Sequence, residues 1–128
     1  MGYCLSNSLS IEGCLEALKK ALKGKKRSES LIHHSDRGVQ YCCKEYILLL
    51  QKENIQISMT QENHCYENAH AERINGILKQ EFNLGVTFNT EQQALSAVCS
   101  AIKTYNQKRP HYALNLKTPD QVYFQKVA

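Results

Sequence analysis

Two acidic side chains stand where this sequence could hold a metal ion. Asp36 ends a short apolar-to-polar run that begins at residue 31, and it precedes a helical pattern that begins near Tyr41, so we expect it at the carboxyl end of a strand. In open α/β sheets, ligands collect at that end of the strands. Glu72 follows after 35 intervening residues. Because carboxylate oxygens are the ligands that Mg²⁺ prefers, this pair of acids is compatible with metal chemistry.

The pattern around Glu72 predicts a helix with two different faces over residues 68–82. One face carries apolar side chains at steps of three and four: Ala71, Ile74, Leu78 and Phe82. The other face is polar and holds Asn68, Glu72, Asn75 and Lys79. Asn68 is expected as the N-cap, which places Glu72 near the first turn, where the helix dipole favours negative charge. A polar face of this kind is also typical of a helix that is only exposed to solvent.

Four motifs occur in a fixed order along the chain. They are His-Ser-Asp-x-Gly at residues 34–38, Tyr-Glu-Asn-Ala-x-x-Glu with Asn-Gly-x-Leu-Lys at 66–79, Tyr-Asn-x-x-Arg-Pro-His at 105–111, and Thr-Pro at 118–119. With these motifs the sequence resembles the DDE-type integrase catalytic core of retroviral integrases and bacterial insertion-sequence transposases, most closely insertion sequence group 3. The last two acidic residues of that family have the same spacing. The resemblance implies an α/β, ribonuclease-H-like fold.

The resemblance also implies a function, namely DNA integration by two-metal phosphodiester cleavage and strand transfer. Asp36 and Glu72 would be catalytic residues and ligands of Mg²⁺ or Mn²⁺, because divalent ions stabilise the attacking and leaving oxygens. The expected partners are transposon ends, target DNA and, in the full-length form, further copies of the protein. The expected location is the bacterial cytoplasm, near the nucleoid, with no membrane association. The residues expected to contact DNA or to position groups beside it are Lys79, Arg73, Asn68, Lys108, Arg109 and His111.

The basic tail supports part of that list independently, because basic groups neutralise phosphates and the interleaved Tyr105 and Tyr112 can stack on exposed bases. The alternative for the tail is structural: Arg109-Pro110 is also a helix stop, and the tail can pack back on the domain.

One catalytic carboxylate of the family is not found in this sequence. The family uses three, and the first Asp lies on the first strand of its sheet. Here we expect the chain to start at about the third strand, formed by residues 2–6, so that the first two strands are missing. We therefore expect the isolated chain to be poorly stable or self-associated, and inactive in DNA joining. The alternative is a non-catalytic remnant that binds DNA or the full-length transposase, and a nuclease on the same fold is a third option.

The remaining pattern predicts a single domain over residues 1–128 with a basic tail at about 103–128. Helices are expected from the N-cap Ser10 to about residue 23, over 41–53 and over 91–107, a strand over 55–59, and loops at 24–28 and 60–67, the second along DNA. The formal net charge of +4 favours an anionic partner. Many small enzymes are also mildly basic without binding nucleic acid, so the charge alone does not identify the partner. Six cysteines without a Cys-x-x-Cys pair favour reduced thiols.

Overall fold

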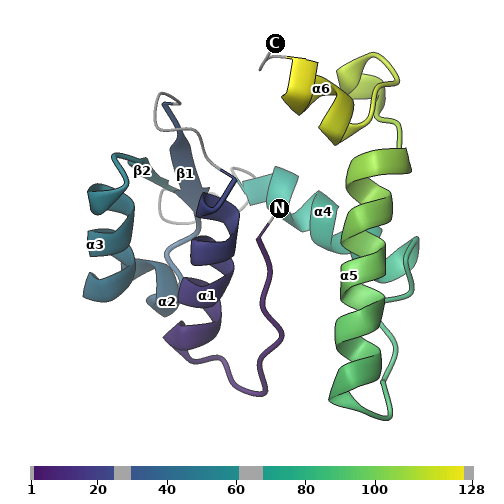
Figure 1. Cartoon of the computed structure of the whole chain (residues 1–128). Coiled ribbons are helices and arrows are strands. Elements are labelled where there is room, and N and C mark those ends of the chain that lie inside the picture. The colour runs from purple at the N-terminus through teal and green to yellow at the C-terminus, as the bar shows by residue number, and fades with distance from the viewer. Residues whose placement is uncertain (1, 25–29, 61–67, 126–128) are drawn as a thin grey trace. The chain divides into compact units, whose positions relative to one another are not determined.

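The computed structural model describes residues 2–24, 30–60 and 68–125 of the chain (Figure 1). The chain forms two compact units, Met1–Arg73 and Ile74–Ala128, and each is described by itself. The loops expected at residues 24–28 and 60–67 lie largely outside the described residues. No helix within the described ranges is long and apolar enough to cross a membrane.

The first unit is built on a short parallel sheet. Strand β1 (Ile32–Ser35) pairs with β2 (Gln56–Met59), with Ser35 opposite Met59. Between them run α2 (Val39–Cys42) and α3 (Lys44–Lys52), so that strand, helices and strand form one crossover (Figure 1). This arrangement confirms the strand expected before Asp36, and it places Asp36 directly after β1 at its carboxyl end.

The core of the first unit joins α1 (Ile11–Leu22) to α3. Buried Leu18, Tyr46, Leu50 and Ile55 form it, and the other apolar residues of the α1 stripe pack against it. Leu50 is only 1% exposed. Ser10 occupies the N-cap position of α1, but its side chain makes no capping hydrogen bond. The Ser10 hydroxyl instead accepts from Ser8 Oγ at 2.9 Å.

Two sequence predictions about this unit are wrong. The helix expected over 41–53 is broken at Cys43, whose extended backbone (φ −75°, ψ 152°) separates α2 from α3. The Cys43 sulfur accepts a hydrogen bond from the backbone N–H of Tyr46 and so caps the second helix. The strand expected over residues 2–6 is absent, because β1 and β2 pair only with each other among the described strands. Ser6 instead bonds locally with the backbone of Ser8.

The second unit consists of helices and a tight loop. Helix α4 (Ala69–Gln80) crosses from the first unit into it, followed by α5 (Glu91–Lys108), the 3-10 helix η2 (Tyr112–Leu114) and α6 (Pro119–Gln125). Thr90 caps α5 by accepting from Gln93 N–H at 3.2 Å. Four α5 residues are buried: Ala94, Ala101, Ile102 and Tyr105. In α4 the buried residue is Ile77, whereas Ala71, which was expected on the apolar stripe, is exposed at the start of the helix.

The Thr-Pro motif has a structural role at the start of α6. Thr118 Oγ1 accepts from Gln121 N–H at 3.3 Å, and Gln121 Oε1 accepts from Thr118 N–H at 2.9 Å. This reciprocal pair is a capping box, and Pro119 fits the first helical position because proline has no N–H to leave unsatisfied. The motif therefore fixes where α6 begins.

Candidate functional site

Asp36 is exposed at the carboxyl end of β1, and one of its oxygens is held in place. The backbone N–H of Gly38 donates to Asp36 Oδ1 at 3.0 Å. A Cβ on Gly38 would lie 3.0 Å from that same oxygen and 3.3 Å from the ring of Tyr41, so a larger residue here would press on the carboxylate. No hydrogen bond from a described residue reaches Asp36 Oδ2, which leaves that oxygen available to an external ligand.

Thr60 contacts both neighbours of Asp36, the backbone of Ser35 and the side chain of Arg37. Its N–H donates to the carbonyl oxygen of Ser35 at 3.0 Å, which continues the ladder of the parallel sheet. Its own carbonyl oxygen accepts from Arg37 Nε at 2.9 Å. Ser35 and Thr60 are both buried, so the contact between them is shielded from water. The position of the Asp36 backbone therefore depends on β2 as well as on β1.

The two histidines before Asp36 are used for packing and for strand contacts. His33 Nε2 lies 3.1 Å from the Tyr46 hydroxyl, and its ring packs edge-on against Tyr46. Burial lowers the pKa of His33 and raises the pKa of Tyr46 to about 12. His34 Nδ1 lies 2.9 Å from Ser58 Oγ on the neighbouring strand. Both histidines thus tie β1 to its surroundings and are not directed at Asp36 by any hydrogen bond described.

Glu72 lies in the first turn of α4 and is exposed. Asn75 and Lys79, three and seven positions further on, are exposed on the same face, as the sequence predicts. Arg73 is exposed as well. Asn68 is half-buried in a 3-10 turn directly before the helix. The connection from β2 to Asn68 runs through residues 61–67, outside the described part, so a shared site for Asp36 and Glu72 stays a prediction.

The carboxylates can be compared with the needs of a divalent metal. Within residues 2–24, 30–60 and 68–125, no group of three or more His, Cys, Asp or Glu side chains gathers as a metal site would require. Mg²⁺, however, commonly binds one or two carboxylates and completes its shell with water and substrate phosphates. Asp36 and Glu72 are exposed carboxylates of the right chemistry, so they fit part of such a set.

Arg109 and His111 are joined to other residues of the second unit. Arg109 donates to both carboxylate oxygens of Glu81, at 2.7 and 2.6 Å, which raises the pKa of its guanidinium. Arg109 Nη1 also lies 3.3 Å from His111 Nδ1. The His111 ring packs against the Tyr105 ring, with 5.0 Å between the two ring centroids. Lys108 is exposed at the end of α5. DNA contact by these residues stays a prediction.

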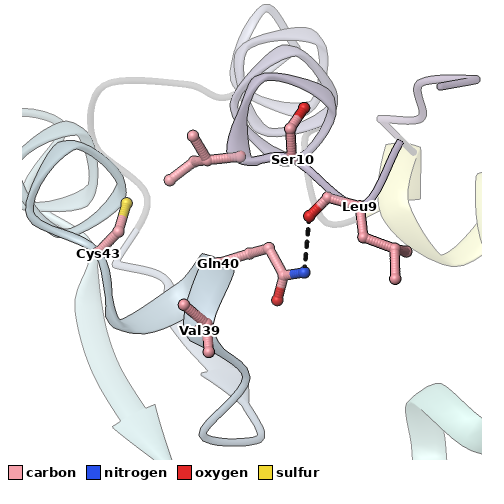
Figure 2. Close-up of a pocket in the computed structure, with 6 residues that line it drawn as sticks. Leu9, Ser10, Val39, Gln40 and Cys43 are labelled. Carbon is pink, nitrogen blue, oxygen red and sulfur yellow. Dashed lines mark hydrogen bonds between the residues drawn. The ribbon is translucent and has the colours of Figure 1, made fainter. Parts of the chain in front are cut away.

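A pocket in the first unit does not include Asp36 in its lining. It has a volume of about 420 Å³ and is lined by Leu9, Ser10, Ile11, Val39, Gln40 and Cys43 (Figure 2). Its polar feature is structural, because Gln40 Nε2 donates to the carbonyl oxygen of Leu9 at 2.9 Å and so joins α2 to the start of α1. The lining is mostly apolar and contains no carboxylate or histidine.

Three residues that matter to these arrangements were not found from sequence: Gly38, Thr60 and Glu81. Parallel strands end at the same edge of a sheet, so the residue after β2 could have been expected beside the residue after β1. Gly38 belongs to a motif already noted, and its closeness to the carboxylate gives that motif a physical reason. Glu81 had no signal, because its pairing with Arg109 spans 28 positions.

The fold places the chain in a recognisable class. The HTLV-2 integrase catalytic core domain, solved in complex with magnesium in a dimeric form, matches with a TM-score of 0.67 at 19% identity, over 92% of this chain and 72% of that one. The structure is therefore similar to a retroviral integrase catalytic core, an α/β fold of the ribonuclease-H type, as the sequence predicts. Of that fold, the described residues contain two parallel strands.

The sequence comparisons identify the family. The integrase core domain family matches residues 53–119, more than half of the chain, so the chain belongs to that family. A 31 kDa protein of insertion element IS600 from Shigella sonnei is 34% identical over 91% of this chain. Transposase InsF of insertion sequence IS3A from Escherichia coli K12 is 32% identical over 94%. The chain spans 43% and 42% of the lengths of these two relatives.

Proposed function

We propose that this chain acts in DNA transposition, as the part of an insertion-sequence transposase that carries two catalytic carboxylates, Asp36 and Glu72. The observation that carries the proposal is the support around Asp36: Thr60 bonds to the Ser35 backbone before it and to the Arg37 side chain after it, and Gly38 N–H donates to one of its oxygens. The family match and the similarity to a transposase that covers 94% of the chain support the same function.

Asp36 and Glu72 would hold Mg²⁺ or Mn²⁺. When bound, such ions neutralise the negative charge that builds up on the attacking and leaving oxygens of a phosphodiester. The chain itself would provide the carboxylates and exposed cations beside them. Lys79 and Arg73 lie on the same helix as Glu72, where they would neutralise backbone phosphates, with Asn68 at its start as a positioning residue. Lys108 would add a further phosphate contact.

The partners in this proposal are transposon ends, target DNA and further copies of the transposase, in the bacterial cytoplasm beside the nucleoid. The dimeric form of the HTLV-2 core supports self-association of the assembled protein. Arg109 and His111, although engaged with Glu81 and Tyr105, border the basic stretch that would meet DNA.

Paramagnetic broadening by Mn²⁺ tests the metal site directly. In amide NMR spectra of the whole chain, low concentrations of Mn²⁺ should broaden signals around both Asp36 and Glu72, because both would be ligands. Asp36→Asn and Glu72→Gln should each weaken the broadening. Glu91→Gln, which removes an exposed carboxylate from the first turn of α5, is the matched control. Broadening that is equally strong in both variants, or confined to other acids, would contradict the proposal.

A second function, DNA binding without catalysis, is favoured by one observation. No third acidic or histidine ligand joins either carboxylate among the described residues. A chain of this kind could occupy DNA ends or join an assembly of the full-length transposase. The double variant Asp36→Asn with Glu72→Gln separates the two functions, because an effect on DNA that survives both substitutions is not metal catalysis.

A further inference from the structure

The second unit presents one aromatic ring almost completely to solvent. Tyr112, in the 3-10 helix η2, is 91% exposed. Tyr105, a second tyrosine of the basic tail, is buried in α5 beside His111. The two rings that the sequence offers for stacking therefore have different roles, and only Tyr112 is available to a ligand. Leu116, four positions later, is 63% exposed.

The loop that carries Tyr112 is held in one conformation. His111 pairs with Lys117 in an antiparallel bridge, in which His111 N–H donates to the Lys117 carbonyl at 3.1 Å. Leu116 N–H donates back to the His111 carbonyl at 2.9 Å. Asn115 and Leu116 both have a positive φ, of 53° and 61°. Non-glycine residues rarely adopt this conformation, and such strain persists where the surroundings enforce it.

Both ends of the loop are also anchored. On one side, Arg109 is clamped to Glu81, and the His111 ring packs on Tyr105. On the other side, the capping box of Thr118 fixes the start of α6. The exposure of Tyr112 is thus not a consequence of a fraying terminus. An exposed ring on a fixed backbone is prepared for binding, because little backbone conformational entropy is lost when a ligand stacks on it.

The charge around the loop indicates what that ligand is. Residues 92–119 contain Lys103, Lys108, Arg109 and Lys117 and no aspartate or glutamate, and of these four cations Arg109 is paired with Glu81. Lys103, Lys108 and Lys117 are exposed. An exposed aromatic ring among cations suits an unpaired nucleotide, because the ring stacks on the base while the cations neutralise phosphates.

We propose that Tyr112 is a stacking platform for an unpaired base of DNA, with Leu116 as a second apolar contact on the same loop. This inference rests on the proposed function, since it names what part of the DNA substrate the basic tail takes. A frayed or single-stranded base at a DNA end is the fitting ligand, because a base inside a duplex offers no free face. The surface is separate from Asp36 and Glu72 in sequence, and it needs no metal ion.

Fluorescence anisotropy with labelled DNA tests the proposal on the whole chain. One duplex is blunt, and a second duplex of the same number of phosphates has an unpaired thymine tail. We expect tighter binding to the tailed duplex. Tyr112→Ala should weaken tailed-duplex binding about tenfold and blunt-duplex binding by less than about twofold, because stacking contributes only where a base is unpaired. Tyr112→Phe keeps the ring and should bind like wild type.

Three further variants distinguish stacking on Tyr112 from general contact with DNA. Leu116→Asn, which tolerates the left-handed backbone but removes the apolar side chain, should reduce the preference for the tailed duplex. Lys108→Gln should weaken binding to the blunt and the tailed duplex by the same factor. Phe124→Ala removes a 61% exposed ring from α6 and is the matched control, with no expected change. Thermal melting of every variant, followed by circular dichroism, should be unchanged, since Tyr112 packs against little of the protein.

The outcomes separate this inference from the proposed function. Wild-type chain that binds neither duplex would contradict DNA binding altogether. Binding to both duplexes with no preference, or a preference that survives Tyr112→Ala, would overturn the stacking role and leave DNA binding standing. A Tyr112→Ala variant with normal DNA binding but altered sedimentation would overturn it in another way, by showing that the loop contacts protein.

Discussion

Arg109 Nη2 lies 2.6 Å from Glu81 Oε1, and together with the Nε to Oε2 contact at 2.7 Å the two side chains form a two-pronged ion pair. The pair joins the end of α5 to the residue that follows α4. Arg109 is 21% exposed and Glu81 48%, so water screens the pair in part. We expect Arg109→Ala to lower the free energy of unfolding by about 1 kcal/mol, measured by urea denaturation.

A double-mutant cycle with Glu81→Ala tests whether the pair itself is responsible. The coupling energy should be about 0.5–1 kcal/mol, more than for the exposed pair of Glu16 and Lys20, which lie 3.8 Å apart on α1. A coupling energy near zero would show that the ion pair itself does not stabilise the chain. Arg109→Ala that reduces DNA affinity without lowering the free energy of unfolding would instead support a role of Arg109 as a DNA contact.

Gly38→Ala should disturb Asp36 while leaving the fold intact. A new Cβ would lie 3.0 Å from Asp36 Oδ1, closer than such atoms normally approach, so the carboxylate must shift by a few tenths of an ångström. Gly38 has a negative φ, so the substitution causes no backbone strain. We expect Mn²⁺ broadening at Asp36 to weaken about threefold or more, because metal ligands tolerate little displacement. The melting temperature should change by no more than about 2 °C.

Gly24→Ala is the control for that substitution, because a Cβ at Gly24 meets no atom within 4 Å. It should change neither metal binding nor melting. Equal Mn²⁺ broadening in wild type and Gly38→Ala would contradict the view that Gly38 is needed to position the Asp36 carboxylate.

Periodicity predicted the elements of this chain well wherever a helix or strand has a clear apolar side. The α1 stripe, β1 before Asp36, β2 and α5 all lie close to where the pattern places them. The break at Cys43 could not be predicted in this way, because apolar residues continue on both sides of it and the capping group is a sulfur that seldom has this role. The strand predicted over residues 2–6 is absent for a different reason. A strand needs a neighbouring strand to pair with, and the sequence pattern does not show which neighbours exist.

The sequence predicts the individual residues of the candidate site, but it does not predict the contacts that hold them in place. Asp36 and Glu72 could be named from their spacing and flanking residues, because those features are local. The contacts of Thr60 with Ser35 and Arg37 depend on the parallel pairing of two strands 20 or more positions apart. The exposure difference between Tyr105 and Tyr112 likewise depends on how α5 packs, and no local pattern distinguishes the two.

Gly76→Ala should stabilise the chain. Gly76 lies within α4, and a Cβ there would meet no atom within 4 Å. Replacing an interior helical glycine by alanine typically adds about 0.5–1 kcal/mol to the free energy of unfolding, because the unfolded chain loses freedom. Gly76 also shares a face with Glu72, four positions earlier. If DNA approaches that face closely, the added methyl group should weaken DNA affinity while urea denaturation shows a gain in stability.

Ser96→Ala on α5 separates the two effects of that substitution. Ser96 is exposed, so the change should raise stability slightly through helix propensity and leave DNA affinity unchanged. Unaltered DNA binding by Gly76→Ala would mean that DNA does not pack against this part of the Glu72 face. A loss of stability in Gly76→Ala would instead contradict the statement that an added Cβ at Gly76 meets no described atom within 4 Å.

His33 should make the first unit less stable in mild acid. Its pKa is lowered from 6.5, chiefly because burial disfavours the charged ring, with His34 as a smaller like-charge contribution. Above pH 6.5 the ring is neutral in both the folded and the unfolded chain and has no effect. As the pH falls below 6.5, the unfolded chain takes up a proton first, so the free energy of unfolding falls until the lowered folded pKa is reached. The urea midpoint at pH 5.5 should therefore lie below the midpoint at pH 7.5. His33→Gln should reduce this difference between the two midpoints. His34→Gln, a change at an exposed position, is the control and should leave most of the difference in place. A difference that persists unchanged in His33→Gln would show that another group causes the acid sensitivity.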